Sequence, residues 1–264
     1  MITSTSNNKI KNIIKLCTNS KARREQNAFV AEGVKMFIEA PSARIREVYV
    51  SEGYLDKITG ITDKSCLNKL ENTGYETVSD QVFAKISDTV TPQGILCVID
   101  RQAQDIGQIL KDHKGRDIRI LAVENVRDPG NLGTMIRTME AAGYDLMLAS
   151  EGTVDVYNPK VIRSTMGSVY RIPVIYTDDL LRDLGLLKKE DISIYAAHLK
   201  GEEYYDCIAY GGRTAVLVGN EANGLSEEAA AMADKLVKIP MQGQVESLNA
   251  AVAAALFLYM TRRR

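Results

Sequence analysis

The chain has 264 residues, of which 45% are hydrophobic and 25% are charged, and its formal net charge is −1 at pH 7. This composition is typical of a globular protein, and no fixed-period repeat or low-complexity tract appears. No stretch of the sequence reaches the roughly 18 consecutive apolar residues of a membrane span, and at about 100 to 200 residues per domain the length predicts two domains.

The cysteines and histidines are isolated from one another. The four cysteines, at positions 17, 66, 97 and 207, form no C-x-x-C pair, and His113 and His198 have no Cys or carboxylate at ligand spacing. This argues against a metal site and against a histidine-activated nucleophile, and it predicts a reducing compartment. Because residues 1–12 are polar and do not resemble a signal peptide, a soluble cytoplasmic protein is expected.

The first 46 residues are basic. They hold nine Lys or Arg against three Glu, a net charge of +6, so this part of the chain either contacts phosphates or is an ordinary solvated surface. Residues 1–24 hold six of these cations and no acidic residue, which makes an organellar transit peptide the alternative to a cytoplasmic location. The helical spacing of apolar residues from Lys9 onward argues against that alternative.

In chain order, a small α/β domain is predicted first. Its helices are expected at residues 9–17, 34–39, 64–72 and 80–87. Its strands are expected at residues 29–31, 45–50, 75–78 and 94–99. Residues 100–117 are polar and weakly patterned, so we place a boundary between a domain of residues 1–105 and a domain of residues 106–264.

The second domain is predicted to be built on a parallel sheet. Its apolar, β-branched runs alternate with helix candidates and lie at residues 118–123, 145–149, 172–176, 192–196, 214–218 and 236–239. Continuous apolar runs of this kind are typical of parallel strands that helices cover on both faces. The whole chain is therefore expected to belong to the α/β class.

Two common nucleotide-binding motifs, G-x-G-x-x-G after a strand and G-x-x-x-x-G-K-[ST], are missing from the sequence. Three polar, glycine-rich segments instead directly follow predicted strands, where open α/β sheets bind their ligands. In the first, residues 125–137, Asn131 is expected to cap a helix that carries Arg137, and such a helix start suits a phosphate or an oxyanion. Taken alone, this segment is equally compatible with a plain strand-to-helix turn.

The other two segments are also rich in polar residues. In residues 217–226, Glu221 lies between two glycines that permit a close backbone approach, and it is otherwise a solvated carboxylate in a tight loop. In residues 239–249, Ser247 is expected to cap the following helix, whose apolar face belongs to the core. Asn249 is harder to explain by packing and is free to direct its amide at a ligand.

In this order, the motifs N-x-x-x-x-x-N-x-G-x-x-x-R, G-N-E-x-x-G-L and I-P-M-x-G-x-x-x-S-L-N resemble the SpoU family of RNA ribose methyltransferases, within the SPOUT superfamily. The resemblance covers about residues 118–262, and the segment R-S-T-M-G-S at residues 163–168 looks like a further family segment near the active site. The N-terminal part is similar to the ribosomal-protein-like RNA-binding domain that many members carry, through Lys21, Arg23, Phe29, Glu32 and Gly33.

The resemblance implies a fold, a reaction and a cofactor. The fold is a parallel-sheet domain with a deep trefoil knot, typically in a homodimer that completes the site across its interface. The reaction is methylation of a ribose 2′-hydroxyl in structured RNA, with S-adenosyl-L-methionine as the methyl donor and without a metal. The residues expected to bind the donor are Leu217, Gly219, Asn220, Ile239, Met241, Gly243, Ser247, Leu248 and Asn249.

The resemblance also implies catalytic roles. Arg137 is expected to stabilise the alkoxide that develops on the ribose, because a guanidinium is protonated at neutral pH and is a poor base. Glu221 is expected to fix Arg137 or its own loop, and a role for Glu221 as proton acceptor stays open. Asn131 and Asn249 are expected to orient Arg137 and the ribose, and Ser247 is expected to position the third segment.

Basic residues of both domains are expected to contact RNA: Lys21, Arg23, Arg24, Arg127, Arg163 and Arg171. Ribosomal RNA is favoured over transfer RNA because of the additional N-terminal domain. The alternatives are a SPOUT base methyltransferase, a transfer-RNA ribose methyltransferase and a non-catalytic RNA-binding protein. The last of these leaves the three motifs unexplained, and the identity of the modified nucleotide stays open.

Overall fold

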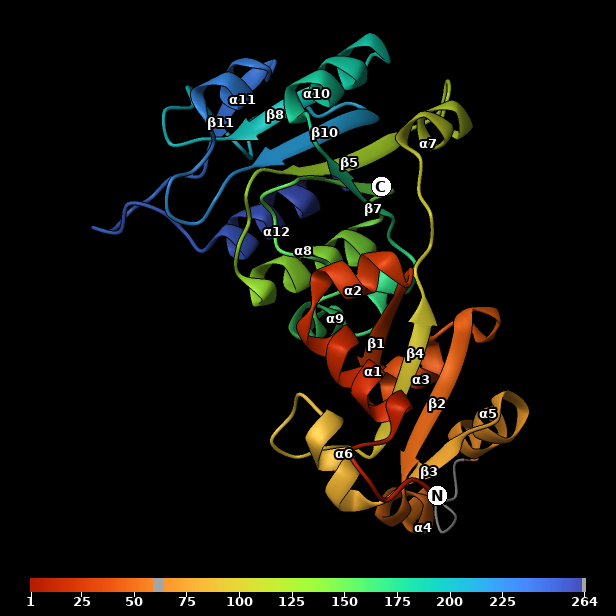
Figure 1. Cartoon of the computed structure of the whole chain (residues 1–264). Helices are drawn as coiled ribbons and strands as arrows, with labels where there is room; N and C mark the ends of the chain where they lie inside the picture. The colour runs from red at the N-terminus through yellow and green to blue at the C-terminus, as the bar shows by residue number, and fades with distance from the viewer. Residues whose placement is uncertain (59–63, 263–264) are drawn as a thin grey trace. The chain divides into compact units, whose positions relative to one another are not determined.

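The computed structural model of the chain describes residues 1–58 and 64–262 (Figure 1). The chain divides into two compact units. The first unit holds Met1–Ala103 and Asp155–Tyr170, and the second unit holds Gln104–Val154 and Arg171–Arg264. The α/β class that the sequence predicts is confirmed, because both units combine a sheet with helices.

The first unit is built on a four-stranded mixed sheet in the order β1-β4-β2-β3. The strands are β1 (Ala28–Glu32), β2 (Ile45–Ser51), β3 (Glu76–Val78) and β4 (Ile95–Asp100). β4 runs antiparallel to β1 and β2, and β3 runs parallel to β2. The helices are α1 (Asn8–Thr18), α2 (Ser20–Glu25), α3 (Val34–Glu39), α4 (Glu52–Ile58), α5 (Ser65–Thr73), α6 (Asp80–Ile86) and α9 (Pro159–Thr165), with 3-10 turns η1 (Ser42–Arg44) and η2 (Ser168–Tyr170).

Alternation along β4 divides the buried side chains of this unit between two faces of its sheet. Leu96 and Val98 belong to a core that includes α1 and α6. Cys97 and Ile99 belong to a core that includes α3 and α5. Because successive side chains of a strand point to opposite faces, one strand supplies both cores.

The segment Asp155–Tyr170 belongs to the first unit, although the residues on both sides of it belong to the second. Ile162 and Tyr170 are buried in the core with α3 and α5. The ring of Tyr157 lies 4.6 Å from that of Phe29, centroid to centroid, and the Tyr170 hydroxyl donates to the carbonyl of Met36 at 3.1 Å. The family segment at residues 163–168 is therefore part of this unit.

The second unit is built on a seven-stranded sheet in which every strand pair is parallel, as the sequence predicts. The strand order is β7-β6-β5-β10-β8-β11-β9. The strands are β5 (Ile118–Val123), β6 (Leu146–Ser150), β7 (Val174–Thr177), β8 (Ser193–Ala197), β9 (Glu203–Tyr204), β10 (Arg213–Val218) and β11 (Lys235–Lys238). β9 is the one strand of this sheet that the apolar runs do not predict, because it has two residues and both are exposed.

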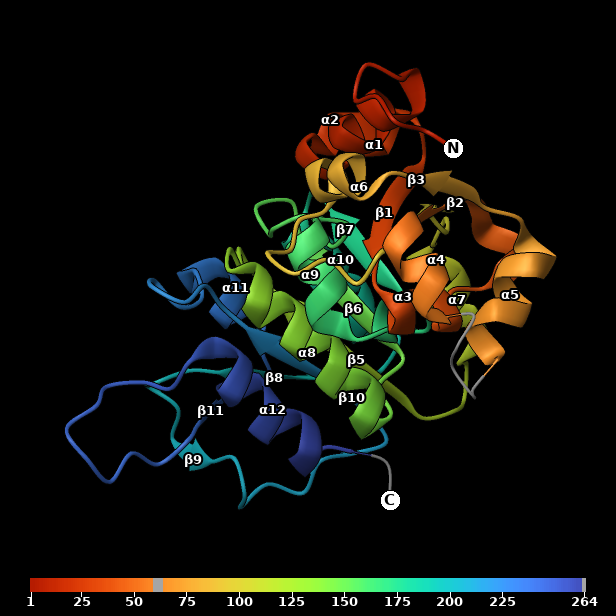
Figure 2. The same cartoon turned by 90° about the horizontal axis from the view of Figure 1, so that it is seen from below.

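Helices cover both faces of this sheet (Figures 1 and 2). They are α7 (Ile106–Asp112), α8 (Pro129–Ala142), α10 (Leu180–Lys189), α11 (Glu227–Ala231) and α12 (Ala250–Met260). α7, α10 and α11 share one core with the sheet, to which Leu184 and Leu217 belong. α8 and α12 pack against each other on the other face. Within the described residues, no helix combines the length and the apolar character that a membrane crossing needs.

The strand order places segments that are distant in sequence side by side. β10 pairs with β5 on one side and with β8 on the other, and β11 pairs with β8. Because the strands are parallel, the loops that follow β5, β8, β10 and β11 meet at one edge of the sheet. The trefoil knot that the resemblance implies stays a prediction.

Candidate active site

Glu221 joins the loop after β10 to the loop after β5. Its carboxylate accepts hydrogen bonds from the backbone N–H groups of Arg127 and Asp128, each at 3.2 Å, and from the side-chain amide of Asn131 at 3.0 Å. Burial raises the pKa of Glu221, but these hydrogen bonds outweigh it, and the pKa is lowered from its ordinary value of 4.5. An ionised carboxylate surrounded by N–H donors is thereby fixed at the strand edge.

Asn249 connects the third motif to the same network. Its amide nitrogen donates to the amide oxygen of Asn131 at 2.9 Å, while its own oxygen accepts from the N–H groups of Ala251 and Val252. This arrangement fixes the orientation of both amides, because the amide nitrogen of Asn131 donates to Glu221 and its amide oxygen accepts from Asn249. A chain of side-chain hydrogen bonds therefore runs from Asn249 through Asn131 to Glu221, and it unites all three motifs.

Two helix caps differ from those expected. α8 begins at Pro129 and is capped by Asp128, whose carboxylate accepts from the N–H of Asn131 at 2.7 Å, so Asn131 lies in the first turn. α12 begins at Ala250 and is capped by Asn249 instead of Ser247. In both cases the expected cap was wrong. Two residues that can cap a helix lie close together, and the residue that directly precedes the first helical residue is the cap.

A pocket of about 320 Å³ opens beside this network, and we refer to it as the loop pocket. The loops after β8, β10 and β11 and the start of α12 form its wall, which is largely apolar or backbone. Its volume and lining are typical of a small-molecule site. Six of the residues expected to bind the donor line it: Gly219, Asn220, Ile239, Met241, Ser247 and Leu248.

The other three residues expected at the donor site lie outside the lining. Leu217 is fully buried within the sheet, Gly243 lies in the exposed loop before α12, and Asn249 serves the cap and Asn131. The pocket also has residues that the sequence did not single out for it, among them His198, Leu199 and Lys200 after β8. The signal for them is the position after an apolar strand run, but only the strand order shows that β8 lies next to β10.

Gly219 is required by its own loop. The backbone N–H groups of Asn220 and Gly224 each donate to the carbonyl of the other at 2.9 Å, which folds the loop back on itself. A Cβ atom on Gly219 would overlap the backbone of Gly224 and Leu225. The close approach that the sequence suggests is therefore made by protein backbone.

Arg137 is exposed on α8. Among residues 1–58 and 64–262, no ion pair or hydrogen bond of its guanidinium is found. Glu221 fixes the loops, and within the described residues no hydrogen bond or ion pair joins it to Arg137. Arg137 lies about 9 Å further along the helix axis than Asn131, at about 1.5 Å per residue. Its charge is thus available to a molecule that arrives from solvent.

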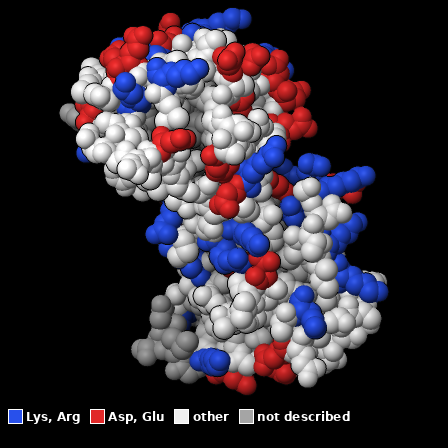
Figure 3. Space-filling view, turned by 90° about the vertical axis from the view of Figure 1, so that its left-hand side faces the viewer, with Lys and Arg blue, Asp and Glu red and all other residues white. Residues whose placement is uncertain are grey.

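The basic residues expected to contact RNA differ in their surroundings. Lys21 and Arg24 are exposed on α2. Arg23 between them is only 3% exposed: its guanidinium donates to the carbonyls of Leu16 and Cys17 and pairs with Asp155 at 2.8 Å. This burial argues against the RNA contact expected for Arg23, because most of its N–H donors are bound by groups of the protein. Figure 3 shows other Lys and Arg side chains gathered over the side of the first unit that carries α1 and α2.

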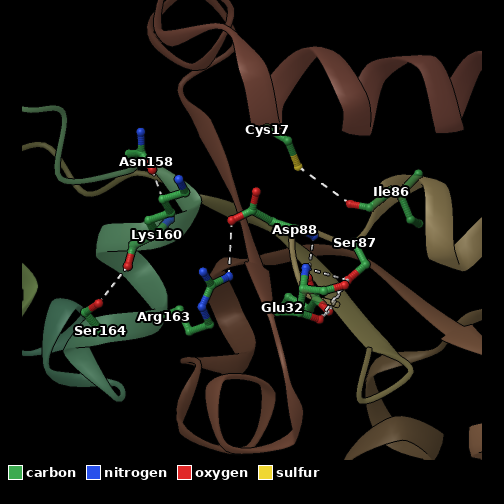
Figure 4. Close-up of polar contacts among 10 residues, drawn as sticks. Cys17, Glu32, Ile86, Ser87, Asp88, Asn158, Lys160, Arg163 and Ser164 are labelled. Atoms are coloured by element: carbon green, nitrogen blue, oxygen red, sulfur yellow. Dashed lines mark hydrogen bonds and ion pairs between the residues drawn. The ribbon is translucent and has the colours of Figure 1, made fainter. Parts of the chain in front are cut away.

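Arg163 binds the loop that follows α6, and Glu32 holds this loop by hydrogen bonds (Figure 4). Arg163 donates to the carboxylate of Asp88 at 3.2 Å, and its side chain is 43% exposed. The carboxylate of Glu32 accepts from the hydroxyl of Ser87 at 2.6 Å and from the N–H of Asp88 at 3.1 Å, which explains why an acid stands at this position. Of the two remaining candidates, Arg127 is exposed, and Arg171 pairs with Glu140 of α8 at 3.0 Å.

Replacing Glu221 by Gln is expected to lower the free energy of unfolding at pH 7, because the amide of Gln would turn N–H groups toward N–H donors. A carboxylate with a lowered folded-state pKa stabilises the protein above its ordinary pKa of 4.5, and this contribution is lost as the pH falls through the folded value. The difference in urea midpoint between the two proteins should therefore shrink on acidification from neutral pH. Glu202→Gln, at an exposed carboxylate, is the control; a difference that does not change with pH would contradict the assignment.

Comparison with known proteins identifies both parts of the chain. The model of the SpoU rRNA Methylase family matches residues 118–259, and that of the MRM3-like substrate binding domain matches residues 7–97. The chain is 33% identical to the 23S rRNA (guanosine(2553)-2′-O)-methyltransferase RlmP of Bacillus subtilis, over 99% of this chain and 98% of that protein. The AdoMet-bound rRNA methyltransferase from Sinorhizobium meliloti superposes with a TM-score of 0.82 at 29% identity, over 98% of this chain and 96% of that one. The chain therefore belongs to the SpoU rRNA methylase family.

Proposed function

We propose that the protein transfers a methyl group from S-adenosyl-L-methionine to the ribose 2′-hydroxyl of a guanosine in 23S ribosomal RNA. The observation that carries this proposal is the hydrogen-bonded chain of Asn249, Asn131 and Glu221 beside the loop pocket. It is supported by the similarity over nearly the whole length of a 23S rRNA guanosine-2′-O-methyltransferase. The reaction needs both a small-molecule site and an adjacent polar surface, and the second unit has both.

The residues of the loop pocket fit the methyl donor. Its apolar wall and the backbone of the loops at Gly219 and Ile239 would hold the adenosyl group, with Leu248 at the start of α12. When bound, the donor supplies an electrophilic methyl group on a sulfonium. The protein's part is to orient the acceptor hydroxyl and to stabilise the negative charge that develops on its oxygen.

Arg137 is the group that stabilises this charge. Its guanidinium is exposed, so it acts electrostatically on the alkoxide or on the adjacent phosphate. Glu221 is a poor proton acceptor, because N–H donors surround its carboxylate and its pKa is lowered. We assign Glu221 and Asn249 to the positioning of Asn131 and of the loops. The proton of the ribose hydroxyl is then accepted by solvent or by the RNA.

A direct assay tests the function. The purified protein is incubated with the radiolabelled methyl donor and 23S ribosomal RNA, with 16S ribosomal RNA and transfer RNA as parallel substrates, and the product is digested to nucleosides. 2′-O-methylguanosine from 23S ribosomal RNA is the expected product. A base-methylated nucleoside, label in transfer RNA alone, or no label would each overturn the proposal. Mapping alkali-resistant positions in cells that lack the protein then locates the nucleotide.

A homodimer is also proposed, and the surface of α12 supports it. This helix is apolar on all sides, and helices of this kind are normally buried all round, yet Val252 is 50% and Tyr259 is 46% exposed. Val252→Glu is expected to convert the dimer to a monomer in sedimentation velocity, because it places a charge on this face. Leu181→Glu, on exposed apolar surface of α10, should leave the dimer intact. A wild-type monomer at micromolar concentration would refute the proposal.

The first unit is proposed to hold the RNA through α2 and the neighbouring basic surface. Replacing Lys21 and Arg24 by Glu is expected to weaken RNA binding and to make the logarithm of affinity less dependent on salt, by a slope of about 0.7 to 0.9 per lost phosphate contact. The matched control is charge reversal at Arg182 and Lys189 of α10 in the second unit. Equal salt slopes for the wild type and the Lys21 and Arg24 variant would mean that the RNA is held elsewhere.

A further inference from the structure

The loop pocket carries two lysines that the function proposed above does not use. Lys200 lies in the loop after β8, Lys238 ends β11, and both line the pocket. The other ionisable groups of the lining are His198 and Glu221, and the carboxylate of Glu221 already accepts hydrogen bonds from the neighbouring loop. Two lysines in a mainly apolar lining provide a site for an anionic group of the ligand.

The charges of these two lysines are not neutralised by the protein. Within the part of the chain that the structure describes, neither Lys200 nor Lys238 forms an ion pair. Lys235 of the same strand, by contrast, pairs with Glu203 at 2.6 Å. The ammonium of Lys238 lies 5.2 Å from the ring centroid of Tyr204, a contact that restrains a cation without cancelling its charge.

The backbone beneath the two lysines is fixed. The N–H of His198 donates to the carbonyl of Val237 at 2.9 Å, and the N–H of Lys200 donates to the imidazole of His198 at 3.1 Å. Gly201 lies so close to β11 that a Cβ atom there would be 2.7 Å from the backbone nitrogen of Lys238. The loop after β8 is therefore packed directly on the end of β11, which fixes the backbone of both lysines before any ligand binds.

We propose that Lys200 and Lys238 bind the carboxylate of the methionine part of the methyl donor. This assignment rests on the proposed function. The carboxylate is the anionic group of the donor, whose ammonium and sulfonium are both positive. RNA phosphate is the other anion in the reaction. Lys200 is exposed and Lys238 is partly buried, but both line the small-molecule pocket, which favours the carboxylate of the donor.

The test compares two ligands that differ in one group. S-adenosylhomocysteine and its decarboxylated analogue are titrated calorimetrically into the wild type, Lys200→Ala, Lys238→Ala and the double variant. Each substitution is expected to weaken S-adenosylhomocysteine about tenfold, as the loss of a charge-assisted hydrogen bond does, and to leave the decarboxylated analogue unchanged. Lys235→Ala, which removes the lysine already paired with Glu203, is the matched control and should change neither affinity.

The outcomes separate the possible explanations. Equal losses for both ligands would show that the lysines only shape the pocket, and unchanged affinities with weaker RNA binding would assign them to phosphate; either result overturns the proposal. A wild-type chain that binds neither adenosyl ligand would overturn the proposed function itself. Recovery of S-adenosylhomocysteine affinity in Lys238→Arg, with the thermal midpoint as a check on folding, would support the carboxylate contact.

Discussion

Replacing Arg137 by Ala is expected to lower the single-turnover rate of methyl transfer by roughly a hundredfold or more, the usual cost of losing a preorganised charge partner. Binding of S-adenosylhomocysteine should be almost unchanged, because Arg137 is exposed and does not line the loop pocket. The free energy of unfolding should also be unchanged, since the guanidinium has no hydrogen bond or ion pair among the described residues to lose.

Arg137→Lys separates charge from geometry at this position. It keeps the positive charge but loses the planar fork of donors, so it is also expected to fail if the guanidinium binds the alkoxide and the adjacent phosphate together. Arg182→Ala, which removes an exposed arginine of α10, is the control and should retain full activity. Near-normal turnover in either Arg137 variant would remove this residue from the mechanism.

Gly219→Val is expected to reduce binding of S-adenosylhomocysteine below the detection limit of calorimetric titration. The reason is local, because the new side chain would overlap the backbone of Gly224 and open the reciprocal hydrogen bonds between Asn220 and Gly224. The wall of the loop pocket and the position of Glu221 both depend on this fold-back. The chain should still fold at moderate temperature, because the change lies beyond the last residue of β10.

Two other glycines provide the controls for this experiment. Gly211 precedes β10, and Gly243 lies in the loop before α12. Apart from their immediate neighbours in the chain, no described residue has an atom within 4 Å of the Cβ position of either glycine. Gly211→Val and Gly243→Ala are therefore expected to bind S-adenosylhomocysteine as the wild type does. If Gly219→Val also binds normally, the loop pocket is not the donor site.

The sequence predicted the architecture of the second unit well, because continuous apolar runs are a strong signal for buried parallel strands. It also selected Glu221, Asn131 and Asn249, which the structure joins by hydrogen bonds. One of the two misplaced caps had a local signal. Proline is favoured at the first position of a helix, so the pair Asp128-Pro129 indicates Asp128 as the cap.

Other features depend on contacts that a linear pattern does not contain. The burial of Arg23 depends on Asp155, which is 132 positions away in the sequence. Lys200 enters the loop pocket only because β8 lies beside β10, and strand order is set by tertiary packing. Charge composition identified the basic first 46 residues, but it does not distinguish a solvated cation from one that joins two segments by an ion pair.

The segment Asp155–Tyr170 has a consequence for how the protein is made. The core with α3 and α5 includes Ile162 and Tyr170, and Arg23 has its carboxylate partner at Asp155. During synthesis, residues 1–103 therefore leave the ribosome before the residues that complete this core. The carboxylate that pairs with Arg23 has also not yet been made. The first unit can be completed only after residue 170 has emerged, when β5, α8 and β6 of the second unit have already been translated. Folding of the first unit is thus completed only during synthesis of the second unit. Cleavage after residue 103 would yield a fragment that lacks part of its hydrophobic core.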